Sequence, residues 1–233
     1  MKTVLVTGGA KGIGFEIVRL LSKGEYMIYV IDRDFANFSM QAPNIKCIEF
    51  DISRVADISA LVQPLEPIDI LVNNVGYMNA LNISEYTIED QEKIFKVNLE
   101  APIEFIKAVV INMKANKFGR IINIASVAGQ IGHPDVWYGA TKAGLINATI
   151  SLSHILKGTG ITINAVSPGP VATQMIKHFS ENRKNFLREY VNVTGEYLDP
   201  KHIADCVSWF AQEKQSYLNG ICLEVNDGVT WFK

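Results

Sequence analysis

The sequence lacks the features that mark secreted, membrane and disulfide-stabilised proteins. Its three cysteines, Cys47, Cys206 and Cys222, lie far apart among 233 residues and form no C-x-x-C pair. This spacing suggests neither a zinc knuckle nor a disulfide framework, and it is typical of a reduced, cytoplasmic protein. The apolar run within residues 1–9 is too short for a signal peptide. No stretch approaches about 18 apolar residues, so we expect no transmembrane helix.

The chain also has no strong charge of either sign. Its 22 Lys and Arg residues against 24 Asp and Glu give a formal net charge of −2. No broad basic surface is therefore expected, and nucleic-acid binding is not predicted as the main function. The histidines have no ligand-like spacing with each other or with the cysteines, so no metal site is predicted. They are His133, His154, His178 and His202.

What the sequence does contain is a regular alternation of short apolar runs and longer amphipathic ones. The length and the 48% hydrophobic content fit one domain over residues 1–233, with no linker or internal repeat. Predicted strands are Thr3–Thr7, Tyr26–Ile31, Ile45–Phe50, Ile68–Val72, Arg120–Ala125, Thr162–Val166 and Ile221–Val225. Predicted helices are Ile13–Ser22, Arg54–Val62, Glu89–Asn98, Pro102–Asn116, Trp137–Leu156 and Lys201–Gln212.

The apolar character of these strands indicates how they are arranged. Strands that are apolar throughout are buried on both faces, as in a parallel sheet. Strand–helix alternation along the whole chain therefore predicts a doubly wound α/β fold with right-handed crossovers.

A glycine-rich stretch, residues 7–14, falls between the first predicted strand and the first predicted helix. Gly8, Gly12 and Gly14 allow a tight turn and leave helix N-terminal amides free to face a pyrophosphate. The spacing is G-x-x-x-G-x-G rather than the general G-x-G-x-x-G, although the mechanism is the same. The alternative is a glycine-rich turn that binds no ligand.

Residues near the end of the second predicted strand bear on the choice of dinucleotide. Asp32 follows Gly14 by 18 residues, close to the offset of about 20 expected for a carboxylate that binds the adenosine ribose. Such a carboxylate would repel the 2′-phosphate of NADP by about 4 kcal/mol at 4 Å, so Asp32 favours NAD. Arg33 and Lys11 favour NADP instead, because either could meet a phosphate, unless both are solvated surface charges.

A tyrosine and a lysine four residues apart form a candidate acid–base pair. Tyr138 and Lys142 would share one face of a helix. A free tyrosine is ionised to only about one part in a thousand at pH 7. A neighbouring lysine charge could supply about 4 kcal/mol, or about three pH units, and so make the phenol usable near neutrality. Alone, Y-x-x-x-K is a weak signal, because most such pairs are exposed helix residues.

Taken together, the motifs resemble the classical short-chain dehydrogenase/reductase family over essentially the whole chain. The family's T-G-x-x-x-G-x-G is matched by Thr7–Gly14, and its N-N-A-G by Asn73–Gly76 with Val75 in place of alanine. The motifs of its active site follow in the family's order, at Asn98, Ser126, Tyr138 with Lys142, and Pro168-Gly169.

The resemblance implies a seven-stranded, mainly parallel Rossmann-type sheet with helices on both faces, and a nicotinamide cofactor. Tyr138 would exchange a proton with the substrate oxygen, which Ser126 would hydrogen-bond. Lys142 would lower the tyrosine pKa and hold the nicotinamide ribose. Asn98 would bend its helix and hold a water that links Lys142 to solvent.

The resemblance also implies a set of cofactor-binding residues, with Asp51 and Ile52 beside the adenine and Thr173 bonding the carboxamide. The full set is Gly8, Lys11, Gly12, Ile13, Gly14, Asp32, Arg33, Asp51, Ile52, Asn74, Gly76, Tyr138, Lys142, Pro168, Gly169, Val171 and Thr173.

Several features go beyond the shared motifs. Ser126 and Tyr138 are twelve residues apart, one fewer than a common family spacing, so the pocket wall from Ala128 to Val136 is expected to differ. His133 lies in this stretch and either faces the substrate or is an ordinary loop residue. Residues 174–198 fall where the family carries its substrate lid, and four of them either line an apolar pocket or pack as ordinary helix residues. They are Met175, Phe179, Phe186 and Tyr190.

The motifs leave more than one function open. The first is an NAD(P)-dependent alcohol dehydrogenase or carbonyl reductase acting on a secondary alcohol or ketone. The alternative is a dinucleotide-binding redox sensor with little turnover, which has no need of the intact Ser126, Tyr138 and Lys142. An epimerase or dehydratase of nucleotide-linked sugars usually demands a longer C-terminal region. The apolar face of Ala140–Ile155 further predicts a homodimer or homotetramer.

Overall fold

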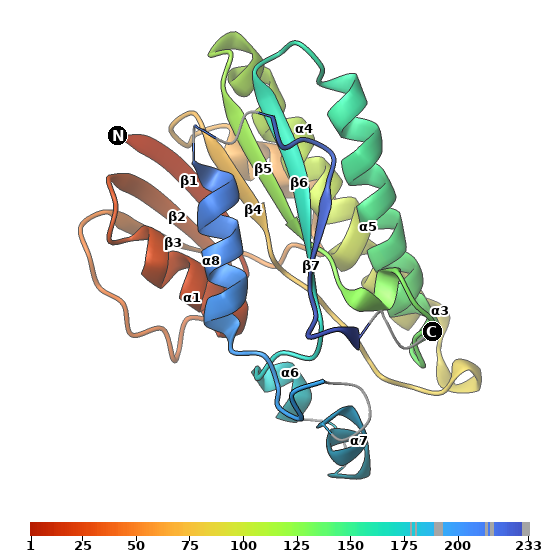
Figure 1. The fold of residues 1–233 in the computed structure, drawn as a ribbon. Helices are drawn as coiled ribbons and strands as arrows, with labels where there is room; N and C mark the ends of the chain where they lie inside the picture. Colours follow the sequence, from red (N-terminus) through yellow and green to blue (C-terminus); the bar gives the residue numbers. More distant parts are fainter. Residues whose placement is uncertain (178, 180, 189–192, 213, 215–216, 230–233) are drawn as a thin grey trace.

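The structure is a computed structural model that describes residues 1–177, 179, 181–188, 193–212, 214 and 217–229. Its centre is a seven-stranded sheet in the order β3-β2-β1-β4-β5-β6-β7, and every strand pair is parallel (Figure 1). The predicted doubly wound sheet is confirmed. The strands are β1 Lys2–Thr7, β2 Tyr26–Asp32, β3 Ile45–Glu49, β4 Ile70–Asn73, β5 Gly119–Ile124, β6 Ile161–Pro168 and β7 Cys222–Val225.

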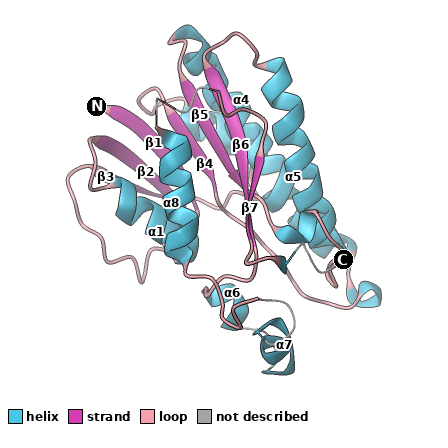
Figure 2. Ribbon diagram, in the orientation of Figure 1, coloured by secondary structure: helices cyan, strands magenta, loops and turns pink. Residues whose placement is uncertain are grey.

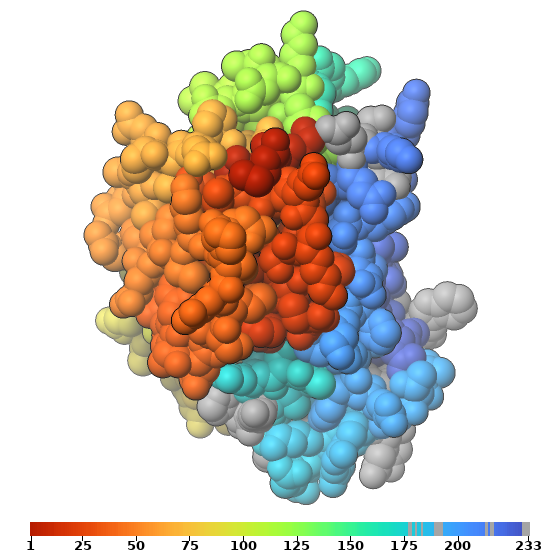
Figure 3. Space-filling model, turned by 90° about the vertical axis from the view of Figure 1, so that its left-hand side faces the viewer, coloured from red at the N-terminus to blue at the C-terminus, as the bar shows by residue number. Residues whose placement is uncertain are grey.

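Helices cover both faces of the sheet (Figure 2). On one face α1 packs against α8, and Figure 3 shows these two helices side by side at the surface. On the other face α2 packs against α4, and α5 lies over β6. The helices are α1 Gly12–Leu21, α2 Ile58–Val62, α3 Ile88–Phe95, α4 Ala101–Ala115, α5 Val136–Ile155, α6 Gln174–Lys177, α7 Glu181–Phe186 and α8 Pro200–Ala211.

The core follows from the two-residue period of the strands. In β1, Val4 and Val6 pack with the α1 and α8 side chains, whereas Leu5 packs with those of α2 and α4. Both sets are buried, so the middle of the strand is apolar at consecutive positions rather than at every second one. This explains why the strands could be read from continuous apolar runs.

Some predicted element boundaries were wrong. The predicted helix Arg54–Val62 is a 3₁₀ turn, Val55–Asp57, followed by the short α2. The two helices predicted over 89–116 are almost continuous, because a π-helical turn, Lys96–Glu100, joins α3 to α4. Such a turn widens the helix locally, and Pro102 is compatible with it because it lies in the first turn of α4.

The chain after β6 leaves the sheet and returns as α8. It forms the short helices α6 and α7, which lie beyond the carboxyl ends of the strands (Figure 1). A bridge between Val171 and Leu198 closes the base of this segment. Within the residues that the structure describes, no helix is both long and apolar enough to cross a membrane.

Candidate active site

The carboxyl ends of the parallel strands bring the sequence motifs to one edge of the sheet. The chain order reverses between β1 and β4, and ligands of doubly wound folds bind at such a switch point. The glycine loop, residues 7–14, follows β1, and Asn74 follows β4. Ser126 follows β5, and Pro168 ends β6.

The glycine loop is shaped to receive an anion. Gly8 and Gly12 have positive φ values of 66° and 57°, which favour glycine. Helix α1 begins at Gly12, inside this glycine-rich stretch, and has no side-chain cap and no acidic residue in its first turn. The first N–H groups of a helix have no intrahelical acceptor, and here no side chain takes that place. The positive end of the helix dipole also lies at the loop. This is the chemistry that a pyrophosphate requires.

Asn74 and Gly14 hold the loop in this shape. The Asn74 side-chain amide donates to the carbonyls of Thr7 at 3.0 Å and Gly8 at 2.9 Å. A Cβ atom at position 14 would lie 2.0 Å from the Gly8 carbonyl oxygen. Gly14 is thus required for packing beneath the loop and does not line a cavity, unlike the other glycines of the motif.

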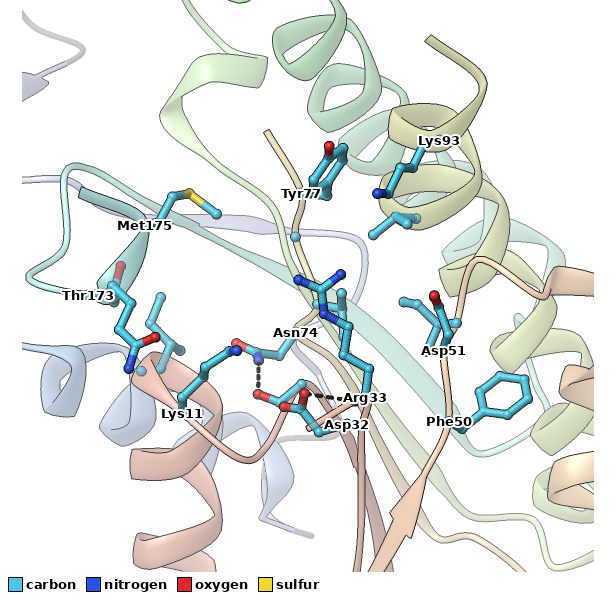
Figure 4. A pocket seen from close by; sticks show the side chains of 18 residues that line it. Lys11, Asp32, Arg33, Phe50, Asp51, Asn74, Tyr77, Lys93, Thr173 and Met175 are labelled. Atoms are coloured by element: carbon cyan, nitrogen blue, oxygen red, sulfur yellow. Dashed lines mark hydrogen bonds between the residues drawn. The ribbon is translucent and has the colours of Figure 1, made fainter. Parts of the chain in front are cut away.

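The first cavity beside this loop, of about 230 Å³, we call the glycine-loop cavity. Charges of both signs line it, and Figure 4 shows Lys11 and Arg33 on either side of Asp32, with Lys93 approaching from α3. Predicted cofactor residues that line it are Gly8, Lys11, Gly12, Ile13, Asp32, Arg33, Asp51, Ile52, Asn74, Gly76 and Thr173.

Asp32 is more buried than a simple ribose-binding carboxylate would need to be. Its side-chain oxygens accept hydrogen bonds from the main-chain N–H groups of Ala10 at 3.0 Å and Arg33 at 2.8 Å. The residue is 6% exposed, whereas Lys11 and Arg33 are exposed. Asp32 therefore also ties the glycine loop to the end of β2.

The second cavity, of about 780 Å³, we call the tyrosine cavity, because Ser126, Tyr138 and Lys142 line it together. Tyr138 and Lys142 lie one turn apart on α5, as their spacing predicts. Ser126 is close enough to act on the phenol, and its side-chain hydrogen bond lowers the pKa of Tyr138. Lys142 is 2% exposed, and its Nζ donates to the Ile124 carbonyl at 2.8 Å.

The protonation of this group differs from the sequence-based expectation. Burial raises the pKa of Tyr138, and the hydrogen bond with Ser126 offsets this only in part. Lys142 Nζ lies 5.9 Å from the centroid of the Tyr138 ring and is directed to Ile124. Burial also lowers the pKa of Lys142 to about 8. The expected lowering of the tyrosine pKa is therefore wrong for this structure, because burial is the largest cause that acts on this pKa and it raises it.

The two cavities share a wall. Ile13, Asn74, Gly76, Thr173 and Met175 line both. A ligand that extends from the glycine loop to Tyr138 would therefore pass directly over these residues. Three more predicted residues, Pro168, Gly169 and Val171, line the tyrosine cavity beside them.

Asn98 lies in the π-helical turn between α3 and α4 and is fully buried. Its side chain accepts from the Tyr77 N–H and donates to the Tyr77 carbonyl, each at 2.8 Å. It also donates to Thr141 Oγ1 at 3.1 Å. Asn98 thus lies in a π-helical turn, where it holds the loop after β4 against α5 without lining either cavity. Its role in holding a water remains a prediction.

The structure adds residues that the motifs did not indicate. Phe50 and Tyr77 line the glycine-loop cavity. Each follows the end of a strand, and this position is the sequence signal that could have identified them as cavity residues. Lys93 reaches the cavity from α3, and no local pattern signals this. In the tyrosine cavity His133 is a wall residue, with its ring centroid 5.5 Å from that of Tyr138.

The expected lid residues divide into described and undescribed ones. Met175, Phe179 and Phe186 line the tyrosine cavity, so the apolar-pocket interpretation is confirmed for these three. Tyr190 lies outside the described residues. The base of the segment is held near the cavity because Ala172 N–H donates to the Leu198 carbonyl at 2.9 Å.

The fold and the site together define a Rossmann-type oxidoreductase, and comparisons with known proteins agree. The short chain dehydrogenase family model matches residues 2–184, so this chain belongs to the short-chain dehydrogenase family. It is 33% identical over 233 residues to the 3-oxoacyl-[acyl-carrier-protein] reductase FabG of Rickettsia felis, covering 98% of this chain and 96% of that protein. The FabG of Haemophilus influenzae is 32% identical over 237 residues, with 98% of each chain covered.

Two further similarities concern part of the chain or the fold alone. The ketoacyl reductase HetN of a Nostoc species is 35% identical over 183 residues, which cover 73% of this chain and 64% of HetN. A solved structure of 4-hydroxyisoleucine dehydrogenase complexed with NADH superimposes with a TM-score of 0.94 over the whole of both chains, at 23% identity.

Proposed function

We propose that this protein is a nicotinamide-dependent oxidoreductase that interconverts a ketone and a secondary alcohol. The observation that carries the proposal is the shared wall between the glycine-loop cavity and the tyrosine cavity. A dinucleotide seated on the glycine loop would present its reactive ring beside Tyr138. The catalytic residues are Ser126, Tyr138 and Lys142, and Asn98, the fourth member of the predicted set, positions the loop after β4 behind them.

The described residues fit a dinucleotide. The uncapped N-terminus of α1 and the positive-φ glycines suit its pyrophosphate, and the buried apolar side chains of Phe50 and Ile52 suit an adenine. When bound, the nicotinamide supplies or takes the hydride. Thr173 holds the carboxamide, and Lys142, with its Nζ close to Gly76, holds the nicotinamide ribose.

The chain's own residues manage the proton. In the reducing direction the Tyr138 phenol donates its proton to the substrate oxygen, and in the oxidising direction it takes the proton back. Ser126 hydrogen-bonds the same oxygen and steadies its developing charge. The phenol, whose pKa burial raises, is protonated at neutral pH, as the acid in the reducing direction must be.

NAD is the proposed cofactor. Water screens the charge of Asp32, which disfavours NADP, less than it screens the charges of Lys11 and Arg33, which favour it. Asp32 is buried and its charge is weakly screened, so it repels the 2′-phosphate of NADP. Lys11 and Arg33 are exposed, so their attraction for that phosphate is screened more. NADP binding remains the competing outcome.

The proposed substrate is a small molecule of the 3-oxoacyl class. The relatives of this chain include reductases named for 3-oxoacyl groups carried on acyl carrier protein. The tyrosine cavity supports an acyl substrate because apolar side chains such as Ile176 and Phe179 line much of it.

Residues 174–198 form the proposed lid within a single domain of residues 1–233.

The test is a titration with NADH and NADPH followed by turnover of 3-oxoacyl thioesters, simple ketones, steroids, sugars and hydroxy acids. Tyr138→Phe removes the hydroxyl and keeps the ring. We expect it to lower kcat/KM by about 100-fold or more, with the dinucleotide Kd changed less than about threefold. Dinucleotide binding without turnover in the wild type would instead support a redox sensor.

We also propose that the protein is a homodimer or homotetramer. Two isoleucines near the end of α5, Ile150 and Ile155, are 42% and 69% exposed. Burying these apolar side chains against a second copy of the chain is more favourable than leaving them exposed to water. Light scattering on the wild type and on Ile150→Glu tests this, because the charge should shift the protein towards monomer.

A further inference from the structure

A buried acidic residue lies three positions before Tyr138 and belongs to none of the motifs. Asp135 is 1% exposed and precedes the first residue of α5. Its Oδ1 accepts from the Tyr138 N–H at 3.0 Å. Its Oδ2 accepts from the Ala80 N–H at 3.1 Å. One carboxylate therefore joins the helix that carries Tyr138 to the loop after β4.

Capping alone does not explain this choice of residue. Ser, Thr and Asn cap helices about as well as Asp. Asp199 caps α8 in the same way, but its side chain is about half exposed, so its charge stays hydrated. At position 135 the charge has lost its water, and the hydrogen bonds from the Ala80 and Tyr138 N–H groups must offset that cost.

The loop that Asp135 holds forms part of both cavities. Gly76 and Met78 line the tyrosine cavity, and Tyr77 lines the glycine-loop cavity. Asn98 anchors this loop at Tyr77, and Asp135 anchors it three residues later at Ala80. Ala80 has a φ of 56°, an uncommon conformation for alanine that the hydrogen bond to Asp135 helps to maintain.

We propose that Asp135 is a positioning residue, whose buried carboxylate fixes the first turn of α5, and with it Tyr138, against the loop after β4 and places a negative charge in the turn that carries the phenol. This inference rests on the proposed role of Tyr138 as the acid–base group. Asp135 would touch neither the cofactor nor the substrate, since it lines neither cavity.

Other charged and titratable groups surround the same phenol. Lys142 lies one turn later on α5, and His133 packs its ring against Tyr138 from the preceding loop. The His133 Nδ1 atom accepts from the Asp135 N–H at 3.1 Å. Beyond Asp135 lies Tyr86, whose pKa is raised by burial and by Asp135, and then Asp90. Burial is the largest cause that raises the pKa of Tyr138, and the Asp135 charge adds to it.

The test is the pH profile of kcat/KM for the reducing reaction in Asp135→Asn. Asparagine keeps a cap acceptor and the shape of the side chain but removes the charge, so tyrosinate becomes easier to form. We expect the alkaline loss of activity to begin at lower pH by about half a pH unit or more. Asp135→Ser is a second uncharged cap with the same expected shift. Asp199→Asn is the matched control and should leave the profile unchanged.

An activity-independent readout separates this inference from the proposed function. Tyrosinate absorbance is titrated against pH in the wild type and in Asp135→Asn. From each curve we subtract the curve of the same protein carrying Tyr138→Phe, so that the difference reports Tyr138 alone. A lower midpoint for Tyr138 in Asp135→Asn supports the inference even if no substrate turns over. An unchanged midpoint and an unchanged pH profile, with only a loss of thermal stability, would reduce Asp135 to an ordinary helix cap.

Discussion

The side-chain amide of Asn74 donates a 2.9 Å hydrogen bond to the carbonyl of Gly8. This contact joins the end of β4 to the glycine loop after β1, across the switch point of the sheet. A second hydrogen bond from the same amide reaches the Thr7 carbonyl. The loop is thus held from outside by a side chain 66 residues further along the chain.

Asn74→Ala should loosen the glycine loop. Removal of both hydrogen bonds leaves two carbonyls unpaired, which should lower the free energy of unfolding by about 1–2 kcal/mol. We expect dinucleotide binding to weaken by about tenfold, because the loop must be ordered again on binding. Calorimetric titration and denaturant unfolding measure these two effects. Asn112→Ala, at an exposed position of α4, is the control, and equal behaviour of the two variants would contradict the prediction.

Gly14→Ala should be damaging although it adds one methyl group. The new Cβ would lie 2.0 Å from the Gly8 carbonyl oxygen, so either the loop or α1 must move. We expect a loss of about 1–3 kcal/mol in stability. Gly132→Ala provides the comparison, because a Cβ there meets no atom within 4 Å. The two thermal midpoints decide the matter, and a normal midpoint for Gly14→Ala would show that the loop tolerates the methyl group.

Asp32→Asn should change the choice between dinucleotides. The variant keeps an acceptor oxygen for the loop but removes the charge that repels a 2′-phosphate. We expect the affinity for NADP to rise relative to NAD by about tenfold, which corresponds to about 1.4 kcal/mol. Dissociation constants for both dinucleotides test this. Asp34→Asn is the exposed control two residues later, and the same ratio in both variants would count against a role for Asp32.

Lys142 should make stability depend on pH in a specific window. Burial lowers its pKa from 10.5 to about 8, so between these values the unfolded chain holds a proton that the folded chain has released. Stability therefore rises with pH in this window, by roughly 2 kcal/mol between pH 7 and pH 10 for this group alone.

Comparison with Lys142→Met isolates this contribution. Methionine fills similar space without a charge, and the Ile124 carbonyl that it leaves unpaired costs an amount that does not depend on pH. The wild type should therefore gain stability relative to Lys142→Met as the pH rises, while Lys157→Met, an exposed position after α5, shows no such trend. Denaturant unfolding at four pH values measures it. A constant difference would mean that the lysine stays charged in the fold.

The sheet was predictable because its signal is local. The central strands are buried on both faces, so nearly every residue in β1, β4 and β6 must be apolar or hydrogen-bonded within the core. The boundaries around Lys96–Glu100 were not predictable, because a π-helical turn has no distinctive local pattern. There Asn98 takes its partners from Tyr77, 21 residues earlier, and a local window cannot include that contact.

The order and spacing of the motifs determined the family and most of the residues that line the two cavities from the strand ends, because parallel strands deliver their carboxyl ends to one edge. Only the tertiary structure decided how those residues are charged and held. Desolvation raised the pKa of Tyr138 despite its lysine neighbour. Asp135 acquired its partner Ala80 from 55 residues away. Burial and distant contacts depend on how the chain closes on itself, so spacing along the chain does not contain them.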